Sequence, residues 1–325
     1  MVALSGCASA WQSSALITNP PHNLPAAREL RETAFFPQQK YQCGPAALAT
    51  VLNRYQHDVS PEVLVPMVYL PARGGSLQLD IVATARRYGM LPYPLAPRLE
   101  DLLREVAAGH PVLVLQNLAF NWLPQWHYAV LMGYDLRQGE VVLRSGTTRR
   151  WQSSLSTFEK TWQRGNYWAL VIVPAGSMPV TAEPAPYLKT AYDLEQTAQL
   201  DAALLAYRAA TKKWPARSEV WLTFGNAAFR TRHYDEALAA FKQVVALAPQ
   251  DARGWNNLAY SLRSRGCMAQ ARRAVACALQ LAPGDANFQD SYQEIFASHK
   301  VSAAVDNLDN SKPGSCVMTP CPEMN

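Results

Sequence analysis

A cysteine, a glutamine shortly before it and a later histidine are the residues of this chain best suited to do chemistry. Cys43 opens the run Cys43–Tyr55, whose apolar residues have helical spacing. At a helix start, unpaired backbone amides and the helix dipole can lower the pKa of a thiol. Gln38 can donate its side-chain amide to an oxyanion, and Gln39 is the alternative donor. These residue types indicate nucleophilic attack on a carbonyl carbon.

The base in this scheme is His127, which begins the apolar run His127–Leu131, typical of a strand. Trp126 beside it would shield the imidazole in part from water. The remaining histidines lie in less suitable places, namely His22, His57, His110, His233 and His299. Alternatively, Cys43 is a buried cysteine at a helix cap and His127 fills a core. Because Gln38, Cys43 and His127 occur together, we favour the catalytic interpretation.

The elements that must position these residues are helices followed by strands. Helices are predicted at Cys43–Tyr55, Leu77–Tyr88 and Leu99–Ala108, and strands at Pro111–Leu115, His127–Tyr134, Glu140–Arg144 and Tyr167–Val173. Since His127–Tyr134 and Glu140–Arg144 form a hairpin, the sheet is expected to be antiparallel. The predicted fold class is α+β.

A cysteine at a helix start, a preceding glutamine and a histidine on a later strand form the papain-like layout. Phe36–Leu52 and His127–Asp135 resemble the bacteriocin-processing double-glycine leader peptidase family, and the resemblance covers about residues 35–174. We therefore predict a papain-like cysteine peptidase domain over residues 30–174. The resemblance implies a cysteine-type peptidase, with nucleophile Cys43, base His127 and oxyanion donor Gln38, and no cofactor.

The chain departs from that family at the residue that orients the histidine. The family usually has an Asp-Pro pair on the next strand, whereas this chain has Ser145-Gly146 in the corresponding stretch. Asp135 is too far along the same strand to reach His127. Folding the hairpin back brings residues 145–148 near His127, and the strand register decides which of them faces it. Ser145 is the candidate orienting residue in this stretch, and Asn117 is a second candidate. A hydroxyl or an amide stabilises an imidazolium less than a carboxylate does, so a slow enzyme is one expectation.

The second half of the chain repeats itself every 34 residues. Pro215, Pro249 and Pro283 have this spacing, and small and aromatic residues keep the same phase: Ala203, Ala237 and Ala271; Tyr187, Trp221 and Trp255; Ala191, Gly225 and Ala259; Tyr207, Phe241 and Val275. This period is the tetratricopeptide signature, in which each unit is a helix–turn–helix pair. We predict a linker at residues 175–186, an all-α repeat solenoid at residues 187–298 with three repeats and a capping helix, and a disordered tail at residues 299–325. The aromatic positions are assigned to the core, and the repeats are expected to bind a protein partner.

The N-terminus resembles a lipobox, with Cys7 as the lipidated residue after Leu4-Ser5-Gly6. The alternative is a free cysteine in a flexible segment, since only a short stretch precedes Cys7 and a signal peptide needs a basic and an apolar region. We predict a lipobox-like N-terminus and tether at residues 1–29. The chain is thus similar to bacterial lipoproteins that join such a peptidase domain to tetratricopeptide repeats. That similarity implies a lipid anchor in the outer membrane, facing the periplasm of the bacterial cell envelope.

The other cysteines give weaker expectations. Cys267 and Cys277 are predicted to be buried small residues in the repeats, and Cys316 and Cys321 could close a small disulfide with each other. No cysteine or histidine cluster has zinc spacing, so no metal is expected.

Composition excludes some classes of function. The net charge of +5 comes from scattered residues without a basic run, which argues against nucleic-acid binding. Apolar stretches are too short to span a bilayer, so membrane contact is expected only through a lipid anchor. The main interpretation is a peptidase acting on a peptide or protein substrate. The alternatives are an inactive papain-like binding scaffold, or an amidase or acyltransferase of the same fold.

Overall fold

The computed structural model describes residues 10–38, 42–297 and 316–322. Two compact units are present, Met1–Ala202 and Ala203–Asn325. Two candidate residues, Cys7 and Gln39, lie outside the described residues. None of the described helices is long and apolar enough to cross a membrane.

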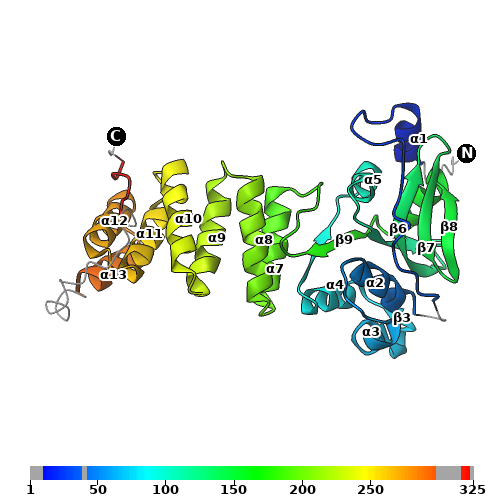
Figure 1. The fold of residues 1–325 in the computed structure, drawn as a ribbon, viewed down its shortest axis with the longest axis horizontal. Helices are drawn as coiled ribbons and strands as arrows, with labels where there is room; N and C mark the ends of the chain where they lie inside the picture. The colour runs from blue at the N-terminus through cyan, green and yellow to red at the C-terminus, as the bar shows by residue number, and fades with distance from the viewer. Residues whose placement is uncertain (1–9, 39–41, 298–315, 323–325) are drawn as a thin grey trace, which may run out of the picture. The chain divides into compact units, whose positions relative to one another are not determined.

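The first unit combines helices with an antiparallel sheet (Figure 1). Its helices are α1 (Trp11–Thr18), α2 (Cys43–Arg54), α3 (Pro61–Val68), η1 (Pro71–Arg73), α4 (Gln78–Arg87), α5 (Leu99–Ala107), α6 (Leu155–Arg164) and α7 (Pro184–Gln196). Its strands are β1 (Ala27–Glu29), β2 (Tyr69–Leu70), β3 (Gly75–Ser76), β4 (Met90–Pro94), β5 (Val112–Asn117), β6 (Trp126–Asp135), β7 (Glu140–Ser145), β8 (Thr148–Ser154) and β9 (Ala169–Pro174). The predicted α+β class is confirmed.

The main sheet runs in the order β4-β9-β5-β6-β7-β8, with β1 added beside the second half of β6. Helices α2, α3 and α4 lie on one side of this sheet, and α1 and α5 lie on the other (Figure 1). The core beneath α2 joins Leu48 and Leu52 to Leu113 and Val130 of the central strands. Burying these side chains contributes roughly 1.5–3 kcal/mol each and fixes where α2 begins relative to β6.

The N-terminal segment is folded rather than a tether. The backbone amides of Gln12 and Ser13, in the first turn of α1, donate to the Glu159 carboxylate of α6 at 3.0 and 2.7 Å. Glu159 is fully buried, so its charge is held by these amides at the positive end of a helix. Strand β1 then pairs with β6, from Ala27 opposite Asp135. The predicted tether is therefore wrong for the described residues, because a buried carboxylate far away in the sequence caps α1.

The predicted linker at residues 175–186 also packs on the first unit. Thr181 donates to buried Glu105 through its backbone amide at 2.8 Å and its hydroxyl at 2.6 Å. Beyond it, Asp193 of α7 forms an ion pair with Arg86 at 2.8 Å. The compact unit consequently extends past the predicted linker to Ala202.

The second unit is a run of paired helices. After α8 (Leu200–Lys213), whose first residues precede the unit boundary, come α9 (Ser218–Arg230), α10 (Tyr234–Leu247), α11 (Ala252–Ser264), α12 (Met268–Leu281) and α13 (Ala286–Ala297). Each repeat proline follows a helix end, and its carbonyl accepts from a side chain of the next helix: Pro215 from Trp221, Pro249 from Trp255 and Pro283 from Gln289. Trp255 is fully buried as predicted, whereas Trp221 is partly exposed. The prediction that every aromatic position of the repeats lies in the core is therefore wrong at Trp221.

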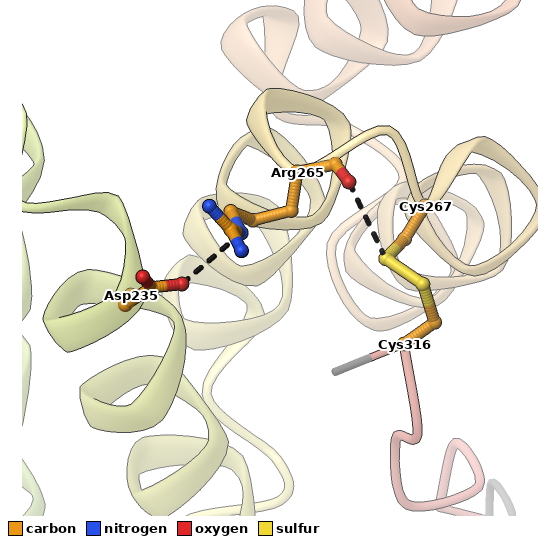
Figure 2. The surroundings of a disulfide bond; sticks show 4 residues. All are labelled: Asp235, Arg265, Cys267 and Cys316. Carbon is orange, nitrogen blue, oxygen red and sulfur yellow. Dashed lines mark hydrogen bonds and ion pairs between the residues drawn. A yellow bond between two sulfur atoms is a disulfide. The ribbon is translucent and has the colours of Figure 1, made fainter. Parts of the chain in front are cut away.

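Two disulfides tie the end of the chain to the repeats. Cys267 bonds to Cys316, and Cys277 of α12 bonds to Cys321. Figure 2 shows the first of them, beside Arg265, whose guanidinium forms an ion pair with Asp235 of α10 at 3.0 Å. The predicted pairing of Cys316 with Cys321 is wrong. The predicted burial of Cys267 and Cys277 is confirmed, and both also form disulfides, which the sequence did not predict. Residues 316–322 are also not the disordered tail that their composition suggested.

Candidate active site

A cleft of about 1130 Å³ in the first unit holds the predicted site residues. Gln38, Cys43 and His127 all line it. Cys43 and His127 are both half-buried. The geometry therefore brings a thiol, an imidazole and a side-chain amide to one accessible surface.

Cys43 is the first residue of α2, as the sequence predicted. The hairpin of β2 and β3 packs directly on this helix start: a Cβ on Gly44 would lie 2.5 Å from the Ser76 Cβ. Only glycine allows this approach, so Gly44 determines how close the wall carrying Ser76 comes to Cys43. Burial raises the pKa of the Cys43 thiol, and the backbone amides of Tyr128, Gly44 and Cys43 lower it by less. The pKa of the Cys43 thiol therefore shifts upward rather than downward as expected, because desolvation outweighs the helix start.

Tyr128, directly after His127, connects the three site residues through its backbone. Its amide interacts with the Cys43 thiol, and its carbonyl accepts from Gln38 Nε2 at 3.3 Å. The Gln38 backbone amide in turn donates to the Gly146 carbonyl at 3.0 Å. Gln38 is therefore anchored at both ends, and its amide group and the Cys43 thiol both interact with the backbone of Tyr128.

His127 contacts Ser145 across the β6–β7 pair. The distance from His127 Nε2 to Ser145 Oγ is 2.8 Å, so Ser145 occupies the place that the sequence suggested for an orienting residue. When Nε2 carries the proton and donates to Ser145, Nδ1 is left free to accept a proton. Burial lowers the pKa of the His127 imidazole, which favours its neutral form near pH 7.

Asn117 does not orient His127. It lies opposite Trp126 in the β5–β6 register, while Gln116 is the partner of His127. Its side-chain oxygen accepts from the backbone amides of Ala119 and Gln125, and its amide donates to the Phe120 carbonyl. Asn117 therefore stabilises the loop between β5 and β6, and the prediction that it orients His127 is wrong. Asp135, excluded on distance, accepts from its own turn at Arg137 and Gln138.

Several residues of the cleft were missed by the sequence-based prediction. Arg73, Ser76 and Asn166 line it, together with Trp126, which was already expected to shield His127. Asn166 follows Gly165, where a Cβ would lie 2.2 Å from the Leu115 carbonyl oxygen, and Asn166 and Tyr167 both have positive φ. Such backbone is sparsely populated and recurs at functional sites. The Gly-Asn pair after an amphipathic helix was the available signal for this turn.

A part of each unit matches a known protein family. Residues 30–169 match the family described as Peptidase_C39 like family, and residues 222–286 match the tetratricopeptide repeat. The chain thus carries a C39-like peptidase domain followed by tetratricopeptide repeats, and the resemblance inferred from the sequence motifs is confirmed. No curated protein matches the chain.

Solved structures resemble parts of the chain. A crystal structure described as that of a C39-like peptidase from Bacillus anthracis is 18% identical, with a TM-score of 0.40. The match covers 46% of this chain and 98% of that one. The MamA RS-1 ArsTM double mutant is 19% identical, with a TM-score of 0.34, over 37% of this chain and 67% of its own. The first tetratricopeptide domain of Spaghetti (RPAP3), bound to an HSP90 peptide, is 14% identical, with a TM-score of 0.34, over 36% of this chain and 93% of its own.

Proposed function

We propose that the first unit is a cysteine peptidase that hydrolyses peptide bonds with Cys43 as nucleophile and His127 as base. The observation that carries the proposal is the convergence of Cys43, His127 and Gln38 on one cleft within a C39-like domain. Ser145, at 2.8 Å from His127, is the proposed orienting residue. The substrate is a peptide or protein segment that can enter an open cleft.

In this mechanism the proton moves during attack rather than before it. A raised pKa of Cys43 and a lowered pKa of His127 favour a neutral thiol beside a neutral imidazole. His127 takes the thiol proton as the sulfur bonds to the carbonyl carbon, and then gives it to the leaving amine. Gln38 Nε2 and the Cys43 backbone amide stabilise the oxyanion, and water later releases the acyl group.

A non-catalytic scaffold is the second candidate function. A neutral Cys43 thiol favours the scaffold function, because a neutral thiol is a poor nucleophile. In addition, no carboxylate is bonded to His127 among the described contacts. An amidase or acyltransferase would use the same residues with another acceptor, and only the products of turnover separate it from a peptidase.

Thiol labelling tests the proposal directly. Cys43 is the free cysteine among the described residues, so labelling is easily assigned by mass spectrometry. We expect a peptidyl epoxide to modify Cys43 at pH 8, and His127→Ala to slow that reaction. Peptide fragments should accumulate with the native chain and be missing with Cys43→Ala. Modification of Cys43 no faster than that of free cysteine, with no cleavage, would leave the scaffold function.

We further propose that the chain works in the bacterial cell envelope, lipid-anchored through Cys7 in the outer membrane. Support comes from the two disulfides, since such bonds persist in oxidising compartments. Metabolic labelling of the native host with an alkyne fatty acid should mark the chain, and Cys7→Ser should remove the mark. An unmarked native chain would refute the anchor.

The repeats are the proposed site for a protein partner, including a folded substrate. A cavity of about 290 Å³ in the second unit is lined by Asn226, Asn257 and Tyr260, and the two asparagines are hydrogen-bonded at 2.8 Å. These amides could pair with the backbone of an extended segment. In a Cys43→Ala chain that retains uncut substrate, Asn226→Ala should weaken retention of whole proteins but not of short peptides. Equal retention of both would assign the repeats a packing role alone.

A further inference from the structure

A loop of exposed aromatic residues borders the cleft. The segment 118–126, here the aromatic loop, comprises the connection between β5 and β6 and the first residue of β6. It places large apolar side chains in water. Phe120 is 64% exposed, Trp122 79%, Leu123 60% and Trp126 55%. Apolar side chains that are exposed together on one short segment, two of them stacked, indicate a binding surface.

The aromatic loop is held in one conformation by its own hydrogen bonds. Asn117 bonds to three backbone groups across the loop, and the Leu118 amide donates to the Gln125 carbonyl at 2.9 Å. Phe120 and Leu123 form a β-bridge. The rings of Phe120 and Trp122 stack with centroids 5.7 Å apart. The apolar side chains are therefore presented by a fixed backbone, which reduces the entropy that binding must overcome.

The aromatic loop is continuous with the wall of the cleft. Gln125 and Trp126 line the cleft together with Cys43 and His127. On the wall formed by residues 73–78, Leu77 also lines the cleft and is 37% exposed. Apolar side chains thus border the candidate catalytic residues from two separate segments of the chain.

The charge of the cleft further restricts the class of ligand that can bind. Among its described lining residues there is no aspartate or glutamate, and Arg73 is the side chain with a permanent charge. A basic segment would therefore find no ionic partner there, whereas neutral apolar side chains would bury surface against the aromatic loop.

We propose that the aromatic loop is the specificity surface of the cleft and receives aromatic or leucine side chains of a bound peptide. The proposal rests on the proposed function, because it assumes that the cleft binds peptides. It adds the class of substrate: a peptide with large apolar side chains next to the segment that enters the cleft, and with no basic residue in that segment. Trp126 lines the cleft beside the candidate catalytic residues. Phe120 and Trp122 lie outside the cleft lining and extend the apolar surface away from it.

Binding to the full chain carrying Cys43→Ala tests this without any need for turnover. Two peptides of equal length and charge are compared by calorimetry, one with Leu and Phe residues and one with Ala and Ser in their place. We expect the apolar peptide to bind at least about tenfold more tightly. Adding Phe120→Ala and Trp122→Ala should reduce that preference to within about threefold. Trp151→Ala removes another exposed tryptophan, which is on β8 and not on the aromatic loop, and should leave the preference intact.

Three results would overturn the proposal: equal binding of both peptides, a preference that survives the double substitution, or an equal loss of preference in Trp151→Ala. A double variant that keeps its peptide preference but no longer associates with phosphatidylcholine vesicles would assign the loop to a membrane surface instead. Turnover is measured separately in the chain with Cys43. Selective binding without cleavage refutes the peptidase alone, and cleavage without selectivity refutes the role of the aromatic loop alone.

Discussion

Ser145→Asp is expected to raise the reactivity of Cys43 at pH 6 by about tenfold or more. Ser145 Oγ lies 2.8 Å from His127 Nε2, so a carboxylate at this position would contact the imidazole. An opposite charge at this distance shifts a pKa by about 1–3 units toward the charged form. The pKa of His127, lowered by burial in the native chain, would therefore rise.

The thiol should respond in the opposite direction. In the proposed Cys43–His127 pair, an imidazolium would stabilise the thiolate, so the raised pKa of Cys43 would fall. In the native chain, reactivity should increase with pH through a midpoint above the ordinary value for a thiol. In Ser145→Asp the reactivity of Cys43 should begin to rise at lower pH, because the thiolate–imidazolium ion pair forms at a pH below that at which a free thiol ionises.

Iodoacetamide alkylation followed from pH 5 to 10 measures this shift. Ser145→Asn is the matched control, since it retains a hydrogen-bonding group of similar size but adds no charge. Ser145→Ala should lower reactivity at every pH by releasing the imidazole. If Ser145→Asn shifts the profile as far as Ser145→Asp does, or if neither moves it, charge at position 145 is not what controls the pair. Thermal unfolding of each variant shows whether the added carboxylate has disturbed the fold.

Loss of the two disulfides is expected to destabilise the second unit strongly and to spare the first. The bonds join residues separated by 49 and 44 positions. Closing a loop of that length reduces the entropy of the unfolded chain, which corresponds to roughly 4 kcal/mol of stability for one bond. The second bond adds less, because the two loops overlap. Such a loss corresponds to a fall in Tm on the order of 15 °C or more for a unit of this size.

Calorimetry with and without dithiothreitol measures the effect. The chain should show a reductant-sensitive transition for the repeats, while the transition of the first unit, whose described cysteine is unpaired, stays in place. A chain with Cys267→Ala and Cys277→Ala should match the reduced protein and no longer respond to reductant. Peptide mapping under non-reducing conditions should recover Cys267 with Cys316 and Cys277 with Cys321. A pair between Cys316 and Cys321, or a Tm that reductant leaves unchanged, would contradict the structure.

The amino-acid sequence by itself determined what repeats and what has local periodicity. The 34-residue spacing of prolines located the helix pairs, because each proline ends a helix through its own backbone chemistry. The helix beginning at Cys43 and the strand carrying His127 were also predicted correctly, since apolar spacing at periods of 3.6 and 2 reflects one buried face. Residue types alone then proposed Cys43, Gln38 and His127 as a site.

Contacts between distant segments were decided only by the tertiary structure. Ser145 rather than Asn117 faces His127 because strand register, which a shift of one residue would reverse, sets the contact. The disulfide partners of Cys267 and Cys277 depend on which repeat helix the C-terminal segment contacts, and the spacing of cysteines along the sequence does not give that contact. The pKa of Cys43 is raised because burial, a property of the assembled fold, outweighs the local helix start. Local chemistry therefore proposed the candidate site residues, and packing determined their neighbours and the direction in which their pKa values shift.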